Sequence, residues 1–171
     1  MYFPSTAALA EYFANNQILE KLEIQCGPDV QYLPDMPVWI KRLRIHGSPN
    51  LRRLGYLPWR LTHLVVEDCP ALTSLRHQPD TLTHLIISRC QSLVNIPQLP
   101  QRFRFLQLTE CPRVVRLPNL PSSMTHLRLD RCLSLVAPAK LPGELSELHV
   151  TNCPDFVGRR LRLGYLKIHI G

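Results

Sequence analysis

Six cysteines are the residues of this 171-residue chain that could most directly do chemistry, because thiolates bind metals, form disulfides and act as nucleophiles. Five of them recur every 21 residues, at Cys69, Cys90, Cys111, Cys132 and Cys153. Zinc ligands come instead as close pairs such as C-x2-C, so this spacing argues against a metal site. One thiol per repeat predicts a buried structural position, where cysteine behaves as a small apolar residue with a weak donor.

Two further interpretations of the thiols stay open. Neighbouring repeats would lie one strand spacing apart, about 4.8 Å, so a strained disulfide could form under oxidising conditions. Cys26 stands one residue out of the cysteine register. We therefore expect Cys26 to be more exposed than the other five and to be the most reactive thiol.

The cysteine spacing belongs to a repeat that runs through most of the chain. Its clearest copy is L-x-x-L-x-L-x-x-C at residues 82–90, where Leu85 and Ile87 alternate with more polar neighbours. This alternation is typical of a half-buried strand. One such strand cannot bury its apolar face alone, whereas stacked in-register copies form a parallel sheet over a continuous core. The sequence therefore predicts an α/β repeat solenoid with one short strand per coil.

Prolines occupy a fixed place in the second half of the repeat. The chain has 16 prolines. Six of them share one position: Pro37, Pro58, Pro79, Pro100, Pro121 and Pro142. Proline fixes φ near about −65° and removes a backbone donor, so this half should be extended and not helical. The strands would then form the concave side of the solenoid, and the proline-rich segments its convex side.

Residues 1–18 do not fit the repeat and predict a helical cap. Ser5 is a plausible N-cap, and the helix should stop at the asparagines 15–16. Leu9, Tyr12 and Phe13 share one helix face, which we expect to cover the open end of the first coil. Residues 19–171 would form the repeat domain, with seven repeats of about 21 residues and a final partial one.

The last repeat is expected to be shorter than the others. Leu163, Leu166 and Ile168 predict a final strand whose first outward residue is Tyr165, after an irregular segment at 158–161.

A second pattern lies at the residue before each of four repeated cysteines. Residues of alternating charge there predict a ladder of ion pairs that sets the register of the coils. These residues are Asp68, Arg89, Glu110 and Arg131.

Strand residues that alternate with the core should point outward and form a candidate binding face. The predicted binding residues are Arg42, Arg44, His63, Val65, His84, Ile86, Phe105, Gln107, His126, Arg128 and His149. Adjacent exposed apolar residues with arginines around them are typical of an interaction surface. The alternative is an ordinary surface with rings stacked along the sheet. A metal site at His63 and His84 is a weaker alternative, because no third ligand column stands beside them.

The net charge keeps nucleic acid or another polyanion open as a different class of partner. Lys plus Arg is 20 and Asp plus Glu is 13, which gives +7. A basic balance suits a polyanion, but the sequence has no cluster of five or more basic residues and no RNA-binding aromatic motif. Nucleic acid is therefore the less favoured partner. No apolar run reaches about 18 residues, so no membrane span is predicted, and no cofactor is predicted either.

The repeat at residues 82–90 resembles leucine-rich repeats, and the likeness covers residues 19–170. The Leu-Pro-Asn-Leu-Pro tail at 117–121 is similar to the short-repeat effectors that Gram-negative pathogens inject into host cells, of the IpaH and YopM kind. This resemblance implies a module that binds a host protein through its concave face, after secretion into the host cytoplasm. Without that context we expect a cytoplasmic protein, and in both cases a monomer.

The resemblance also raises the question of catalysis. Ubiquitin ligases among these effectors use a C-x-D nucleophile in a separate helical domain, and residues 153–155 of this chain spell Cys-Pro-Asp. Because Cys153 occupies the repeated core position, we expect no catalytic residue here. The resemblance implies instead the substrate-recognition part of an E3 ubiquitin ligase whose catalytic domain lies elsewhere. A repeat domain that masks an enzymatic domain in cis is the remaining interpretation.

Overall fold

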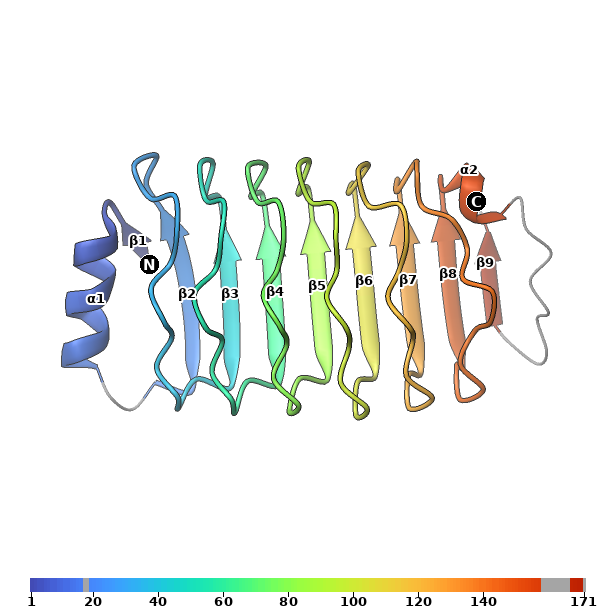
Figure 1. The fold of residues 1–171 in the computed structure, drawn as a ribbon, viewed down its shortest axis with the longest axis horizontal. Helices are drawn as coiled ribbons and strands as arrows, with labels where there is room; N and C mark the ends of the chain where they lie inside the picture. Colours follow the sequence, from blue (N-terminus) through green and yellow to red (C-terminus); the bar gives the residue numbers. More distant parts are fainter. Residues whose placement is uncertain (17–18, 158–166, 171) are drawn as a thin grey trace.

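The computed structural model of the chain describes residues 1–16, 19–157 and 167–170, and it forms one parallel sheet with its strands in chain order (Figure 1). The strands are β1 (Tyr2–Phe3), β2 (Lys21–Cys26), β3 (Arg42–His46), β4 (His63–Glu67), β5 (His84–Ser88), β6 (Phe105–Thr109), β7 (His126–Asp130), β8 (Glu147–Thr151) and β9 (Lys167–Ile170). From β2 to β8 each residue pairs with the one 21 positions later, as Leu64 does with Leu85. The predicted repeat solenoid is confirmed.

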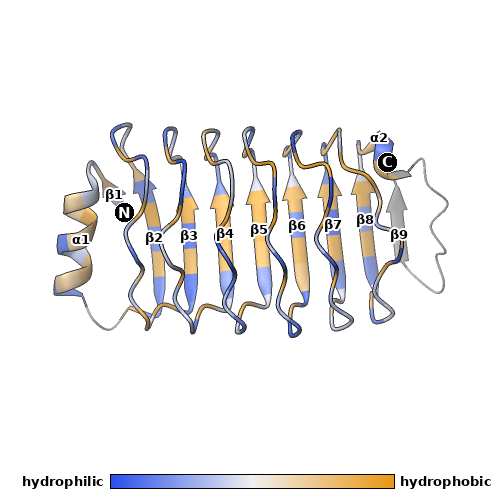
Figure 2. Ribbon diagram, viewed as in Figure 1, coloured by the Kyte–Doolittle hydropathy of each residue, from blue (hydrophilic) through white to orange (hydrophobic). Residues whose placement is uncertain are grey.

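The core lies between the sheet and the segments that return to it. From β2 to β8, the second and fourth residues of each strand are aliphatic, point inward and are fully or almost fully buried, as Leu106 and Leu108 are in β6. The return segments add buried residues such as Leu72 and Leu93 from the opposite side. Figure 2 shows the resulting apolar band across the middle of the strands. Each coil buries its apolar residues only against the neighbouring coils, as expected for a solenoid.

The repeated proline marks the turn into the next strand. Its carbonyl accepts a hydrogen bond from the backbone N–H three residues later, as Pro79 does from Leu82 at 2.9 Å and Pro121 from Met124 at 3.1 Å. Proline lacks an N–H, so this position uses only the acceptor that the residue has. Between β2 and β8, the described return segments contain isolated parallel bridges such as Ser74 with Asn95, and no helix.

The cysteines close the turn at the other end of each strand. The Sγ of Cys69 donates to the carbonyl of Glu67 at 3.3 Å, and the Sγ of Cys90 donates to that of Ser88 at 3.5 Å. Ser48 occupies the same position two repeats before Cys90, and its hydroxyl donates to the carbonyl of His46 at 3.1 Å. The thiols therefore serve as buried donors to the turning backbone, as the spacing predicted.

The residue before each of the five repeated cysteines has a left-handed backbone, which the sequence did not reveal. Its φ is 50–53° at Asp68, Arg89, Glu110, Arg131 and Asn152, and Gly47 has φ 55° in the equivalent place. This conformation costs a non-glycine residue about 1–2 kcal/mol. Hydrogen bonds to the next coil stabilise this conformation, as the bond from the Asp68 N–H to the Ser88 carbonyl does at 3.1 Å.

The predicted charge ladder forms only in part. Two separate ion pairs are present, Arg89 with Asp68 and Arg131 with Glu110.

The prediction that Cys26 is exposed was wrong. Cys26 is 2% exposed, because the short strand β1, which was not predicted, pairs with β2 and sets Phe3 beside Cys26. On its other side the Cys26 N–H donates to the Ser48 hydroxyl at 3.0 Å. All six cysteines are free and buried.

The N-terminal helix forms where the sequence predicted it. Helix α1 spans Thr6–Asn15, and the Ser5 hydroxyl accepts a hydrogen bond from the Ala8 N–H at 3.2 Å. Leu9 is fully buried, while Tyr12 and Phe13 are partly buried against the core. Figure 1 shows α1 at the end of the sheet, beyond β1.

The register predicted for the last strand was wrong by two residues. Lys167 and not Tyr165 pairs with Glu147, and Ile168 pairs with Leu148. The final interval is therefore 20 residues, from 148 to 168, and it aligns the isoleucines of β9 with Leu148 and Val150 of β8. A short helix, α2 (Pro154–Val157), follows β8. The predicted irregular segment at 158–161, Leu163 and Leu166 lie outside the described residues.

We expect Leu106→Ala to lower the free energy of unfolding by about 2–5 kcal/mol, because the substitution leaves a cavity in a fully buried position between two coils. Denaturant unfolding measures the change. Leu133→Ala is the matched control, since Leu133 is 54% exposed, and it should change stability by less than about 0.5 kcal/mol. A Leu106→Ala loss below about 1 kcal/mol would contradict this core.

We expect all six thiols to resist a thiol reagent under native conditions. Burial raises the pKa of Cys69 to about 12 and that of Cys111 to about 11, so few thiolates are present there. A hydrogen bond with Cys132 lowers the pKa of Cys153, so its protection depends on burial alone.

Labelling followed by mass spectrometry at increasing denaturant concentrations tests this expectation. Cys153 should react first as the coils open, and Cys26 should react no faster than Cys69 before they do. Rapid native labelling of Cys26 would show that β1 does not protect it.

Candidate binding face

The eleven predicted binding residues lie in two columns on the outward sheet face, by which we mean the strand side chains that alternate with the core. The first column holds Arg42, His63, His84, Phe105 and His126, and the second holds Arg44, Val65, Ile86, Gln107, Arg128 and His149. All of them are exposed or half-buried, while the strand residues between them are buried. Their predicted placement is therefore correct, and their role in binding stays a prediction.

Four rings stack along the first column. The ring centroids of His63 and His84 are 4.3 Å apart and the rings are 8° from parallel. His84 and Phe105 follow at 5.7 Å and 22°, and Phe105 and His126 at 6.0 Å and 38°. These distances follow from the strand spacing, because paired residues of a parallel sheet stand directly side by side. The column therefore presents ring edges rather than open ring faces to a partner.

Threonine hydroxyls hold the histidine rings in place. The Oγ1 atoms of Thr62, Thr83 and Thr125 lie 2.8 Å from the Nδ1 atom of the histidine that follows each of them. Each hydroxyl also donates its proton to a backbone carbonyl, at 3.0–3.2 Å. The oxygen must therefore accept from Nδ1–H. This assigns the Nδ1–H tautomer to the neutral rings and leaves Nε2 as a hydrogen-bond acceptor.

These threonines are functional candidates that the sequence analysis missed. The signal was present, because the dipeptide Thr-His recurs at residues 62–63, 83–84 and 125–126, one or two repeats apart. The role of each threonine depends on the carbonyl of the previous coil, which the sequence does not place beside it.

The middle of the second column is apolar and its two sides carry ion pairs. Val65 and Ile86 are paired neighbours on β4 and β5, and both are half-buried. On the β3 side, Arg44 contacts Glu23 at 2.9 Å and Glu67 at 2.7 Å. These contacts raise the pKa of Arg44, with the hydrogen bond to Glu67 as the main cause.

Arg128 forms the corresponding contact on the other side of the apolar centre. Its guanidinium lies 2.8 Å from Glu147, and its Cζ is 5.6 Å from the centroid of Phe105. This distance allows a cation–π contact. Carboxylates therefore balance the charges of both Arg44 and Arg128, and the face has an apolar and aromatic centre between paired charges.

The two stacked imidazoles are harder to protonate than free histidine. Desolvation lowers the pKa of His63, and the charges of His84 and Arg42 lower it further. Desolvation also lowers the pKa of His84, with smaller effects of His126 and Arg104. Both rings are therefore neutral at pH 7, when their Nε2 atoms can accept hydrogen bonds.

Metal sites and membrane spans are the other possibilities for the described ranges 1–16, 19–157 and 167–170. Within them, no three His, Cys, Asp or Glu side chains gather as a metal site requires. None of the helices described there has both the length and the apolar character needed to cross a bilayer.

Comparison with known proteins adds a structural neighbour. No protein-family model and no curated protein matches the sequence. Among solved structures, YopM from Yersinia enterocolitica WA-314 is similar, with a TM-score of 0.25 and 16% sequence identity. The likeness covers 88% of this chain and 55% of that chain, so this chain spans little more than half the length of that structure. The parallel solenoid and its repeat fit a leucine-rich-repeat protein on their own geometry.

We expect the pKa values of both His63 and His84, measured by NMR titration of the imidazoles, to lie below the ordinary value of 6.5. Below pH 6.5 the two histidines therefore bind fewer protons in the folded state than in the unfolded state. Their contribution to the free energy of unfolding is complete above about pH 6.5 and is lost as the pH falls through the folded pKa values. Replacing both residues with Gln should reduce this dependence of the unfolding free energy. Titration of either ring above 6.5 would contradict the desolvated stack.

Proposed function

We propose that this chain is a protein-recognition module that binds its partner through the outward sheet face. The observation that carries the proposal is the apolar centre that Val65, Ile86 and Phe105 form on three consecutive strands, half-buried and surrounded by ordered polar groups. Apolar patches of this kind mark contact sites, and aromatic anchors surrounded by water-excluding polar groups supply most of the binding energy.

The arrangement of the face also favours a protein over a polyanion. Phosphate binding depends on basic side chains that release counterions. Here Arg44 and Arg128 are already engaged by glutamates. Affinity for the partner should therefore fall only slightly between low and physiological salt, whereas a polyanion binder would lose affinity steeply over that range.

The repeat resemblance extends the proposal to the biological setting. We propose a host-cell protein as the partner of a monomeric module, which would belong to a bacterial effector delivered into host cytoplasm. Its place in such an effector would be substrate recognition for a ubiquitin ligase domain outside these residues. The Leu-Pro-Asn-Leu-Pro tail at 117–121 supports this setting.

We propose no catalytic role for this chain itself. Cys153 is 2% exposed and its thiol donates to the Thr151 carbonyl at 3.3 Å, as the other repeated cysteines do in their turns. A nucleophile must reach its substrate, which a buried turn thiol does not.

We also propose that α1 caps the solenoid. The burial of Leu9 at the end of the core supports this role.

We expect Phe105→Ala to weaken partner binding by at least about 30-fold, equivalent to about 2 kcal/mol, because truncation removes the aromatic anchor. Ile86→Asp should abolish binding, since it introduces an unpaired charge into the apolar centre. Affinity is measured by biolayer interferometry with the partner that wild-type protein captures from host-cell lysate. Both variants should keep the unfolding midpoint, because neither side chain is in the core.

The matched control is Tyr56→Ala. Tyr56 is 66% exposed on a return segment, so its loss should leave binding unchanged. Equal binding by wild type and Phe105→Ala, with both folded, would overturn the proposal. A fall in affinity with rising salt as steep as that of a polyanion binder would favour the other class of partner.

A further inference from the structure

The return segment between β7 and β8 departs from the repeat. An aliphatic residue stands six positions after the cysteine position in the earlier coils: Leu33, Leu54, Leu75, Ile96 and Leu117. The corresponding residue here is Pro138, and Ala139 stands where Pro118 follows Leu117. One large apolar side chain is therefore missing from this coil.

The missing side chain changes the packing of the two last full coils. Arg116 bridges to Val136, an interval of 20 residues, whereas Ser74 bridges to Asn95 at the usual 21. The slip brings the small Ala137 into the core at 3% exposure. As a result Leu117 is only half-buried, while the residues at its position in all earlier coils are buried: Leu33, Leu54, Leu75 and Ile96.

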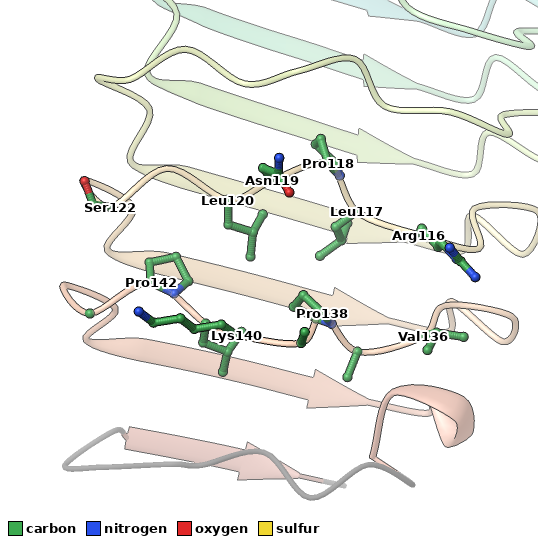
Figure 3. A pocket seen from close by; sticks show the side chains of 14 residues that line it. Arg116, Leu117, Pro118, Asn119, Leu120, Ser122, Val136, Pro138, Lys140 and Pro142 are labelled. Atoms are coloured by element: carbon green, nitrogen blue, oxygen red, sulfur yellow. The ribbon is translucent and has the colours of Figure 1, made fainter.

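The slip leaves a cavity of about 620 Å³ between the return segments 116–122 and 136–143, which we call the return-side crevice. Figure 3 shows Leu117 and Leu120 projecting from one segment toward the other, which carries Pro138 and Lys140. Arg116 and Val136 lie at one end of the crevice, and Ser122 and Pro142 at the other. The crevice therefore runs along two neighbouring return segments.

The charges at the crevice have one sign. Among the described residues, Arg116 and Lys140 are the only charged ones that line it, and both are exposed. The rest of the lining consists of Leu, Val, Ala, Pro and Gly residues with Asn119 and Ser122. An apolar floor between cationic side chains suits an apolar group flanked by carboxylates.

We infer that the return-side crevice binds an extended acidic peptide segment of a protein partner, with a leucine- or isoleucine-sized side chain inserted where this coil lacks its own. The volume lies within the range of about 300–1,000 Å³ typical of ligand sites and exceeds that of one side chain, so several residues fit. Neither wall contains a helix, and the two segments run alongside each other, which matches an occupant that lies along them. The crevice lies on the return side, in front of the sheet in Figure 1, and so is a second site beyond the outward sheet face.

The test is peptide phage display on the whole chain, with counter-selection on the double variant Pro138→Leu/Ala139→Pro. This variant restores the Leu-Pro pair of residues 117–118 and should close the crevice. Selected peptides should be enriched in Leu or Ile beside Asp or Glu. A synthetic copy of the most enriched peptide should bind wild type in fluorescence polarisation and lose at least about tenfold in affinity for the closed variant.

A charge-reversal variant keeps the test valid if the closed variant is unstable. Arg116→Glu/Lys140→Glu alters only exposed side chains and should also weaken the peptide at least about tenfold. The matched control is Arg53→Glu, at the same repeat position three coils earlier, which should leave peptide affinity unchanged. Phe105→Ala should also leave it unchanged, which separates this site from the outward sheet face.

Three results would overturn the inference. The first is a selection in which no peptide distinguishes wild type from the closed variant. The second is a set of crevice-dependent peptides that lack acidic residues and bind the charge-reversal variant equally well. The third is saturable binding of dodecanoate by wild type but not by the closed variant, with no peptide selected, which would assign the crevice to an acyl chain.

Discussion

In-register hydrogen bonding between neighbouring coils is the constraint on which the rest of this structure depends. Each strand residue from β2 to β8 pairs with the residue 21 positions away, so every position of the repeat becomes a column across the sheet. A column tolerates only side chains that can lie about 4.8 Å from their neighbours. Aliphatic residues meet this spacing requirement inside the solenoid, and thiols meet it at the turn. Rings and paired charges meet it on the outward face.

The same constraint explains the backbone strain at the end of each strand. After β3 to β8 the chain leaves the sheet through a left-handed residue, and charged side chains adopt this conformation at Asp68, Arg89, Glu110 and Arg131. At these four residues, hydrogen bonds to the next coil and from the cysteine thiol that follows offset the strain. Because the turns are equivalent, no single coil carries the whole cost.

Column geometry also produces the two candidate sites. On the outward sheet face, it brings residues from β4 to β7 into one ring stack and lets Glu67 and Glu147 neutralise the arginines beside the apolar centre. On the return side, one departure from the repeat at Pro138 interrupts a column of aliphatic residues and opens a crevice. Regular stacking of the coils forms the outward sheet face, and a local departure from that stacking forms the return-side crevice.

The sequence by itself determined what the repeat specifies: the solenoid, the inward leucines and cysteines, the helix at Thr6–Asn15 and the eleven outward residues. These depend on local period and on neighbours one repeat away, and both are visible along the chain. Only the tertiary structure decided the burial of Cys26, the register of β9, the tautomer of the Thr-His pairs and the pairing of Arg44 and Arg128 with glutamates. At the two ends of the solenoid, the repeat does not specify which residues pair. Within the repeat, the choice of hydrogen-bond and ion-pair partners depends on side-chain geometry between coils, and the linear sequence pattern does not contain that geometry.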